Sequence, residues 1–348
     1  MRAAVFQQPG LIEVVDRPDP VIRDSTDAVV RVTATCVCGS DLWYFRGLTP
    51  RQHGQTIGHE FVGVVEAVGS DVGTLRVGDF VIAPFMWSDG DCAHCLFGAP
   101  TSCTRGGIWG APGADGAQGE AVRVPFAGAT LVTVPGGHPS AELIPSLLAL
   151  ADVMGTGHHA AVSATVVAGG VVAVVGDGAV GLCGIIAAQR LGAERIIALS
   201  RNPQRQALAA RFGATDIVAE RGEDAAAALA ELTGGIGVDS VLECVGTGES
   251  MATAFDIVRP GGSIGYVGVP HGTEFPVPRM FGGNIGVRGG LAPARRYLPE
   301  LLTDVLAGTI DPGAVFDSRV ALEDIARGYA SMDDRSSIKV LVELSLSV

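Results

Sequence analysis

The sequence predicts an α/β protein with an irregular β-rich part followed by a doubly wound parallel sheet. Up to about residue 150, short runs with a period near two are broken by Gly, Pro and Asp, as in barrel-like β domains. From about residue 170, continuous apolar strands alternate with helical patterns. Such alternation is typical of a parallel sheet covered by helices on both faces.

The individual elements follow from these patterns. In the first part, the clearest strands are expected at 28–32 and 61–68. In the second part, strands are expected at 171–175, 195–199, 216–218, 238–243 and 262–267, and helices at 180–190, 203–212, 224–232 and 250–258. A helix around 299–307 and a strand at 338–342 close the chain.

The composition and net charge limit the classes of function that this chain can have. The 348 residues are 47% hydrophobic and 18% charged, which is typical of a globular protein. The net charge of −13 argues against nucleic acid or an anionic membrane as a partner, since both usually require a basic face. No apolar run approaches a membrane span, and the first residues lack the pattern of a signal peptide, so we expect a cytoplasmic protein. Seven cysteines in such a protein favour metal binding over disulfides.

A GxGxxG motif directly follows the strand at 171–175 and opens a helix, the context expected of a dinucleotide-binding Rossmann unit. Gly176 permits the tight turn, Gly178 lets the backbone approach a pyrophosphate, and Gly181 allows the helix to pack closely on the strand. Ala179 and Val180 begin the helix, whose N-terminus would face the phosphates.

The end of the second strand bears on the choice of cofactor. An NAD site usually has Asp or Glu there, whereas this chain has Ser200 and Arg201. We expect no carboxylate to repel a 2′-phosphate, and Arg201 can pair with one. The sequence therefore favours NADP(H) over NAD(H); the alternative is that Arg201 stacks on adenine or points to solvent.

Two groups of residues have the chemistry of zinc ligands. Cys38 and His59, the latter followed by Glu60, are too few for a closed structural site, which suggests further ligands or a catalytic metal with an open position. A Gly-rich loop adds a second group with gaps of three, three and eight residues, which could close a tetrahedral structural site: Asp89, Cys92, Cys95 and Cys103. His94 competes with Asp89 for the fourth place, but its position between two cysteines would turn its ring away.

With these motifs in order, the chain resembles the zinc-dependent alcohol dehydrogenases of the medium-chain dehydrogenase/reductase superfamily. The resemblance covers nearly the whole chain and includes GHE at 58–60, VGDFV at 77–81, the cysteine loop, the GTGHHA stretch and VGVP at 267–270. It implies a GroES-like catalytic domain at 1–152 and 290–348 and a Rossmann domain at 153–289. It also implies a homodimer or homotetramer.

The resemblance assigns further roles. Asp152 would be the third ligand of the catalytic zinc, and Glu60 a neighbouring carboxylate that can join the metal. Ser40 would contact the substrate oxygen, and Thr156 would lie near the nicotinamide. Further cofactor contacts would come from Val245, Val267, Val269 and Lys339. Many members have a proton-relaying His where this chain has Trp43, so the relay would be shortened to Ser40, the cofactor ribose and water.

The implied reaction is the reversible oxidation of an alcohol to an aldehyde or ketone, with one catalytic and one structural zinc per subunit. The alternatives are a polyol or formaldehyde-type dehydrogenase that uses NAD(H), and an inactive NADP(H)-binding protein. His158 and His159 are expected to follow a turn; we interpret them as structural, and the alternative is that they line the cofactor cleft.

Overall fold

A computed structural model describes residues 1–344 and separates the chain into two compact units. The first comprises Met1–Asp152 and the described residues from Pro293 on, and the second comprises Val153–Ala292. The chain thus leaves the first unit after Asp152 and returns to it at Pro293.

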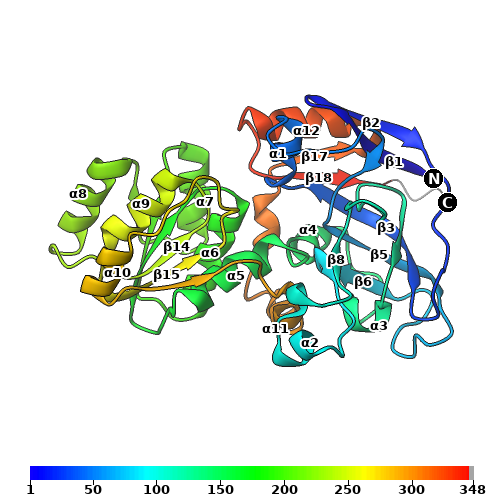
Figure 1. The fold of residues 1–348 in the computed structure, drawn as a ribbon, viewed down its shortest axis with the longest axis horizontal. Coiled ribbons are helices and arrows are strands. Elements are labelled where there is room, and N and C mark those ends of the chain that lie inside the picture. Colours follow the sequence, from blue (N-terminus) through cyan, green and yellow to red (C-terminus); the bar gives the residue numbers. More distant parts are fainter. Residues whose placement is uncertain (345–348) are drawn as a thin grey trace. The chain divides into compact units, whose positions relative to one another are not determined.

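The first unit is built from β-sheets, as predicted. Its largest sheet has the order β10-β6-β5-β3-β18-β17, with β9 also pairing with β3; β2-β1-β4 and β7-β8 form two smaller sheets. Figure 1 labels β3, β5, β6, β17 and β18 of the largest sheet. The strands are β1 (Arg2–Gln8), β2 (Leu11–Asp16), β3 (Ala28–Val37), β4 (Gln55–Thr56), β5 (Phe61–Val68), β6 (Phe80–Ala83), β7 (Met86–Trp87), β8 (Gly107–Ile108), β9 (Ala121–Val124), β10 (Val132–Thr133), β17 (Ser318–Ala321) and β18 (Val340–Glu343). An apolar core that includes Phe61, Val81 and Tyr329 lies within this unit.

Short helices connect these strands. They are α1 (Asp41–Phe45), α2 (Ala93–Phe97), η1 (Pro100–Ser102), α3 (Ala127–Thr130), α4 (Ile144–Ala149), α11 (Ala294–Leu306), η2 (Pro312–Val315), η3 (Leu322–Asp324) and α12 (Ile325–Asp333). Strand β18 pairs antiparallel with β3, with Val340 opposite Val37 and Leu341 opposite Cys36. This register brings the residue before β18 close to the end of β3, where the first predicted ligand follows.

The second unit is a six-stranded sheet of order β13-β12-β11-β14-β15-β16, and its paired strands are all parallel. Read in chain order, this is the 3-2-1-4-5-6 arrangement of the Rossmann fold, which confirms the predicted fold class. The strands are β11 (Val171–Val175), β12 (Arg195–Leu199), β13 (Asp216–Val218), β14 (Val238–Glu243), β15 (Val258–Tyr266) and β16 (Gly286–Gly289). Helices accompany them (Figure 1): α5 (Val153–Ser163), α6 (Ala179–Arg190), α7 (Pro203–Arg211), α8 (Gly222–Leu232), α9 (Gly248–Ile257) and α10 (Val277–Gly283).

Within the described residues, none of the helices is both long and apolar enough to cross a membrane.

Candidate metal centres and cofactor site

The first candidate site lies where two antiparallel strands of the first unit meet. Cys38 follows β3, and His59 and Glu60 precede β5; Thr35 of β3 pairs with Phe61 of β5, so the two strand ends are neighbours. Asp152 joins them from the end of the unit's first segment. One possible ligand atom from each of the four residues lies within 4.8 Å of all the others.

The donor set and its burial fit a divalent cation. His59 Nε2 lies 3.4 Å from Asp152 Oδ2, and Cys38 Sγ lies 3.9 Å from the same oxygen. Burial raises the pKa of both the Cys38 thiol and the Glu60 carboxyl, because it disfavours their charged forms. A bound cation offsets this cost and keeps thiolate and carboxylate ionised.

Asp41 orients His59 from the side of the imidazole ring opposite the cluster. Its Nδ1 lies 3.4 Å from Asp41 Oδ1, which leaves Nε2 facing the cluster. Asp41 Oδ2 in turn accepts hydrogen bonds from the Cys38 amide at 3.0 Å and from Gln118 Nε2 at 3.3 Å. Burial opposes ionisation of Asp41, but His59 and the Cys38 amide are among the groups that outweigh it and lower the pKa of the carboxyl. A carboxylate behind a histidine ligand fixes its tautomer and raises its basicity.

Glu60 forms a buried ion pair with Lys339. The Lys339 ammonium lies 2.7 Å from Glu60 Oε1, and both side chains are only 1% exposed. Its Nζ also lies 3.4 Å from the carbonyl oxygen of Val37. The structure therefore places Lys339 against the metal cluster, and its expected contact with the cofactor stays a prediction.

The predicted proton acceptor lies next to this cluster in sequence. Ser40 is half-buried at the N-terminus of α1, and its side chain makes no capping hydrogen bond to that helix. Trp43 is half-buried within the same helix. His53 is exposed, and its Nδ1 lies 3.1 Å from the carbonyl oxygen of Gln7.

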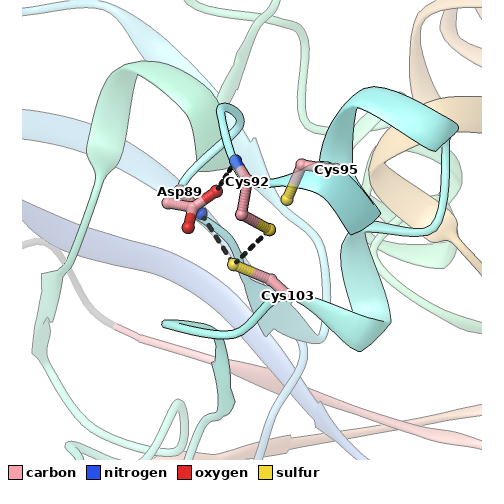
Figure 2. Close-up of side chains that lie close together, drawn as sticks. All are labelled: Asp89, Cys92, Cys95 and Cys103. Atoms are coloured by element: carbon pink, nitrogen blue, oxygen red, sulfur yellow. Dashed lines mark hydrogen bonds between the residues drawn. The ribbon is translucent and has the colours of Figure 1, made fainter.

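The second cluster lies in the loop around α2. The carboxylate of Asp89 and the sulfur atoms of Cys92, Cys95 and Cys103 face one another there (Figure 2), all within 4.8 Å. The Cys92 and Cys103 sulfur atoms are 3.9 Å apart, and the Asp89 amide donates to Cys103 Sγ at 3.3 Å. His94 is exposed on α2 and is not part of this cluster.

The local backbone shapes this second cluster. Asp89 Oδ1 accepts the amides of Asp91 and Cys92, both at 3.0 Å, and Arg105 Nε donates to Oδ2 at 2.9 Å. Burial opposes ionisation, but these donors outweigh it and hold the pKa of Asp89 well below its usual range. Hydrogen bonds from the backbone lower the pKa of Cys92 to about 7, whereas burial raises that of Cys95 to about 12. Three thiols and a carboxylate this close together fit a zinc ion, which would hold the thiols as thiolates.

The dinucleotide motif has the expected geometry in the second unit. Gly176 has φ +118°, a conformation that favours glycine, and a Cβ at Gly181 would meet the Gly176 carbonyl oxygen at 1.9 Å. Gly178 is the N-cap of α6, and a Cβ there would meet nothing within 4 Å, so its backbone is open to a ligand. This open cradle at a helix N-terminus fits a pyrophosphate.

The remaining predicted cofactor residues belong to the same unit. Ala179 and Val180 form the first turn of α6, and Val245 follows β14. Val267 and Val269 follow β15; ligands of open parallel sheets bind at the carboxyl ends of the strands. Thr156 is half-buried within α5.

The structure corrects the expectation that no carboxylate near Ser200 would repel a 2′-phosphate. No acid stands at the end of β12, but the glycine loop supplies a carboxylate there: Ser200 Oγ donates to Asp177 Oδ2 at 3.0 Å. Arg205 Nη1 donates to the Asp177 carbonyl oxygen at 3.1 Å. Sequence reasoning missed both residues because their proximity to Ser200 depends on tertiary structure. Arg201 is exposed.

Comparisons with known proteins identify the family of this chain. The model of the alcohol dehydrogenase GroES-like domain matches residues 24–136, and that of the zinc-binding dehydrogenase domain matches residues 179–307. A probable zinc-binding alcohol dehydrogenase of Mycobacterium tuberculosis is 37% identical over 339 residues, covering 97% of this chain and 86% of the relative. The NADP-dependent isopropanol dehydrogenase of Thermoanaerobacter brockii is 34% identical over 323 residues, covering 89% and 90%.

Comparison with a solved structure shows that the similarity also holds for the fold. The alcohol dehydrogenase TADH of Thermus sp. ATN1 has a TM-score of 0.91 at 34% identity, covering 99% of this chain and 100% of that one. With the family established, the two clusters are zinc sites: a catalytic site with Cys38, His59 and Glu60, and a structural site with Cys92, Cys95 and Cys103. The chain belongs to the zinc-binding alcohol dehydrogenases of the medium-chain dehydrogenase/reductase superfamily, which use a nicotinamide cofactor.

Proposed function

We propose that this enzyme interconverts an alcohol and its aldehyde or ketone, with NADP(H) preferred over NAD(H), at a zinc held by Cys38, His59 and Asp152. The observation that carries this proposal is the buried cluster at the ends of β3 and β5, with its ligand atoms within 4.8 Å. Three protein ligands leave a position for substrate, as in catalytic zinc sites. Glu60, paired with Lys339, is the neighbouring carboxylate that can join the metal.

The fourth ligand of the structural zinc is Asp89 in this proposal. Its carboxylate belongs to the cluster, whereas His94 does not. Its hydrogen bonds favour the ionised form that a zinc ligand needs, and a carboxylate oxygen can accept several partners. A closed four-ligand site would hold together a loop with little apolar content of its own.

The chain's own residues would position the substrate and remove its proton. Zinc, when bound, supplies a Lewis acid that acidifies an alcohol hydroxyl, and the nicotinamide accepts the hydride. Ser40 would accept the hydroxyl proton, since its side chain is not committed to capping α1. Position 43 cannot relay this proton, because an indole nitrogen only donates. The relay would therefore pass from Ser40 through the cofactor ribose to water, without a histidine at that position.

The preference for NADP(H) is proposed from Ser200 and Arg201. Arg201 is exposed directly after β12, where a guanidinium can pair with a 2′-phosphate. The relative from Thermoanaerobacter brockii, which is NADP-dependent, supports this proposal. Equal kcat/KM with both cofactors would overturn it.

We also propose a cytoplasmic homodimer or homotetramer. Phe281 and Val277, which are 87% and 65% exposed, lie on α10 just before the edge strand β16. Large exposed apolar side chains favour association with another protein surface. Light scattering coupled to size-exclusion chromatography measures the state, and a monomer at micromolar concentration would contradict the proposal.

A panel of alcohols, polyols, formaldehyde and ketones, assayed with both cofactors on protein of measured zinc content, tests the proposed reaction. We expect zinc-dependent oxidation of at least one alcohol. Cys38→Ser should abolish that turnover, and undiminished turnover in this variant would refute the zinc mechanism. Binding of NADP(H) without turnover of any substrate would instead support an inactive binding protein.

A further inference from the structure

The glycine-rich loop carries a carboxylate that the phosphate-binding motif does not require. Asp177 stands between Gly176 and Gly178, and its side chain is 15% exposed. It accepts a hydrogen bond from Ser200 Oγ at 3.0 Å. Ser200 occupies the strand end where an NAD site usually has the acid that accepts the ribose hydroxyls. The carboxylate missing from β12 therefore arrives from the loop after β11.

Arg205 holds this carboxylate from α7. The Arg205 side chain is 7% exposed, and its Nη1 donates to the carbonyl oxygen of Asp177 at 3.1 Å and lies 3.4 Å from Oδ1. The first turn of α7 is fixed by Asn202, whose Oδ1 accepts the amides of Gln204 at 2.9 Å and Arg205 at 3.3 Å. Asp177 is thus held by two donors rather than left as a mobile surface acid.

The charged residues near Ser200 have opposite effects on the binding of a 2′-phosphate. A ribose 2′-hydroxyl can donate to the Asp177 carboxylate, whereas a 2′-phosphate is repelled by it. Arg205 is paired with Asp177, whereas Arg201 is exposed directly after Ser200 and can attract the phosphate. A site built in this way favours the phosphorylated cofactor without excluding the other.

We infer that Asp177 is a specificity-determining residue, which retains affinity for NAD(H) and limits the preference for NADP(H), while Arg205 sets the strength of this effect. The inference deepens the proposed function and rests on it, since Arg201 is there the residue that attracts the 2′-phosphate. Its distinctive consequence is that substitutions of Asp177 and Arg205 shift cofactor choice in opposite directions.

The test measures the Kd of NAD⁺ and NADP⁺ for the zinc-loaded protein by calorimetry, which needs no turnover. Asp177→Asn keeps the shape and an acceptor for Ser200 but removes the charge. The ratio of the NAD⁺ Kd to the NADP⁺ Kd should rise about tenfold, which corresponds to about 1.4 kcal/mol. Arg205→Gln should lower the same ratio by about tenfold. The rise in Asp177→Asn should shrink in high salt, because ions screen a partly exposed charge.

Two controls separate a charge effect from loss of structure. Arg205→Lys keeps the charge and should stay close to the wild-type ratio even if Arg205→Gln unfolds. Asp216→Asn removes a carboxylate at the amino end of β13, where it pairs with Arg195 at 2.8 Å, and should leave the ratio unchanged.

The outcomes distinguish this inference from the proposed function. The wild-type ratio tests the proposed preference for NADP(H), whereas the change in Asp177→Asn tests the role of Asp177. A wild-type preference for NAD⁺ combined with a rise in Asp177→Asn would refute the former and support the latter. If Asp177→Asn weakens both cofactors equally and leaves the ratio unchanged, Asp177 only holds the loop and the inference is overturned.

Discussion

The buried pair of Glu60 and Lys339 gives the sharpest test of how the catalytic cluster is held. We consider Lys339→Met, which keeps the length of the side chain but removes its charge. The Glu60 carboxylate would lose a partner at 2.7 Å in a place where its side chain is 1% exposed. Breaking a buried ion pair from one side costs about 3–5 kcal/mol, because the other charge stays buried without compensation.

The loss should depend on pH in a definite direction. Burial raises the pKa of Glu60, and the Lys339 ammonium counteracts this. Without the ammonium, the pKa of Glu60 in the folded protein rises further above its unfolded value of about 4.3. A carboxyl with a raised pKa stabilises the fold below its unfolded pKa and loses that contribution as pH rises through the folded pKa. The destabilisation of Lys339→Met should therefore be larger at pH 7.5 than at pH 5.

Urea unfolding of protein freed of zinc by a chelator, so that no cation compensates the Glu60 carboxylate, measures this effect by circular dichroism at both pH values. Arg319→Met is the matched control, because Arg319 pairs with Glu343 at 2.9 Å between the neighbouring strands β17 and β18 but is half-exposed. That change should cost about 1 kcal/mol or less. The double variant Glu60→Gln/Lys339→Met should recover most of the lost stability. A loss in Lys339→Met no greater than that of Arg319→Met would refute the reasoning.

Three further predictions concern other parts of the molecule. Asp41→Asn should weaken zinc binding at the catalytic site by about 10- to 100-fold, measured by competition with a chelator, because His59 loses the carboxylate that orients it; unchanged affinity would contradict that role. Cys103→Ser should release the structural zinc and lower the melting temperature while Cys38 and His59 still bind zinc, and metal analysis with calorimetry checks both effects. Burial lowers the pKa of His159 to about 4, so the fold loses stability as pH falls from about 6.5 towards 4. His159→Gln should flatten the stability profile in that interval by about 1–2 kcal/mol, and an unchanged profile would exclude His159 as the cause.

The sequence predicted the fold well where one local pattern dominates. The continuous apolar run at 171–175 and the strands at 195–199 and 238–243 have the bounds of β11, β12 and β14. Strand β16 was missed because Gly286–Gly289 reads Gly-Val-Arg-Gly, and its pairing with β15 supplies what local propensity lacks.

The prediction of a turn before the two histidines of the GTGHHA stretch is wrong. His158 and His159 lie within α5 rather than after a turn. A Cβ at Gly157 would meet the Gly184 amide nitrogen at 2.5 Å, so this glycine permits close packing of α5 on α6. The same residue type signals a turn or a helix contact, and only the tertiary structure separates the two.

The candidate sites were predictable to the extent that ligand chemistry depends on residue type and spacing. The metal clusters bring together the cysteines, His59 and the carboxylates that the motifs and the resemblance indicated. Gln118 and Asp177 were missed, because their roles arise from contacts with Asp41 and Ser200 that no spacing reveals. Lys339 pairs with Glu60 because β18 lies beside β3, a long-range pairing that local patterns do not encode.

The central claim is that Asp152 completes the ligand set of the catalytic zinc. Zinc content per chain in Asp152→Ala, measured together with alcohol turnover, tests it most directly. With two ligand clusters, the wild-type enzyme should hold about two zinc ions per chain. The variant should retain the structural ion, lose most of the catalytic one and lose turnover. Two tightly bound zinc ions and undiminished turnover in Asp152→Ala would contradict the account.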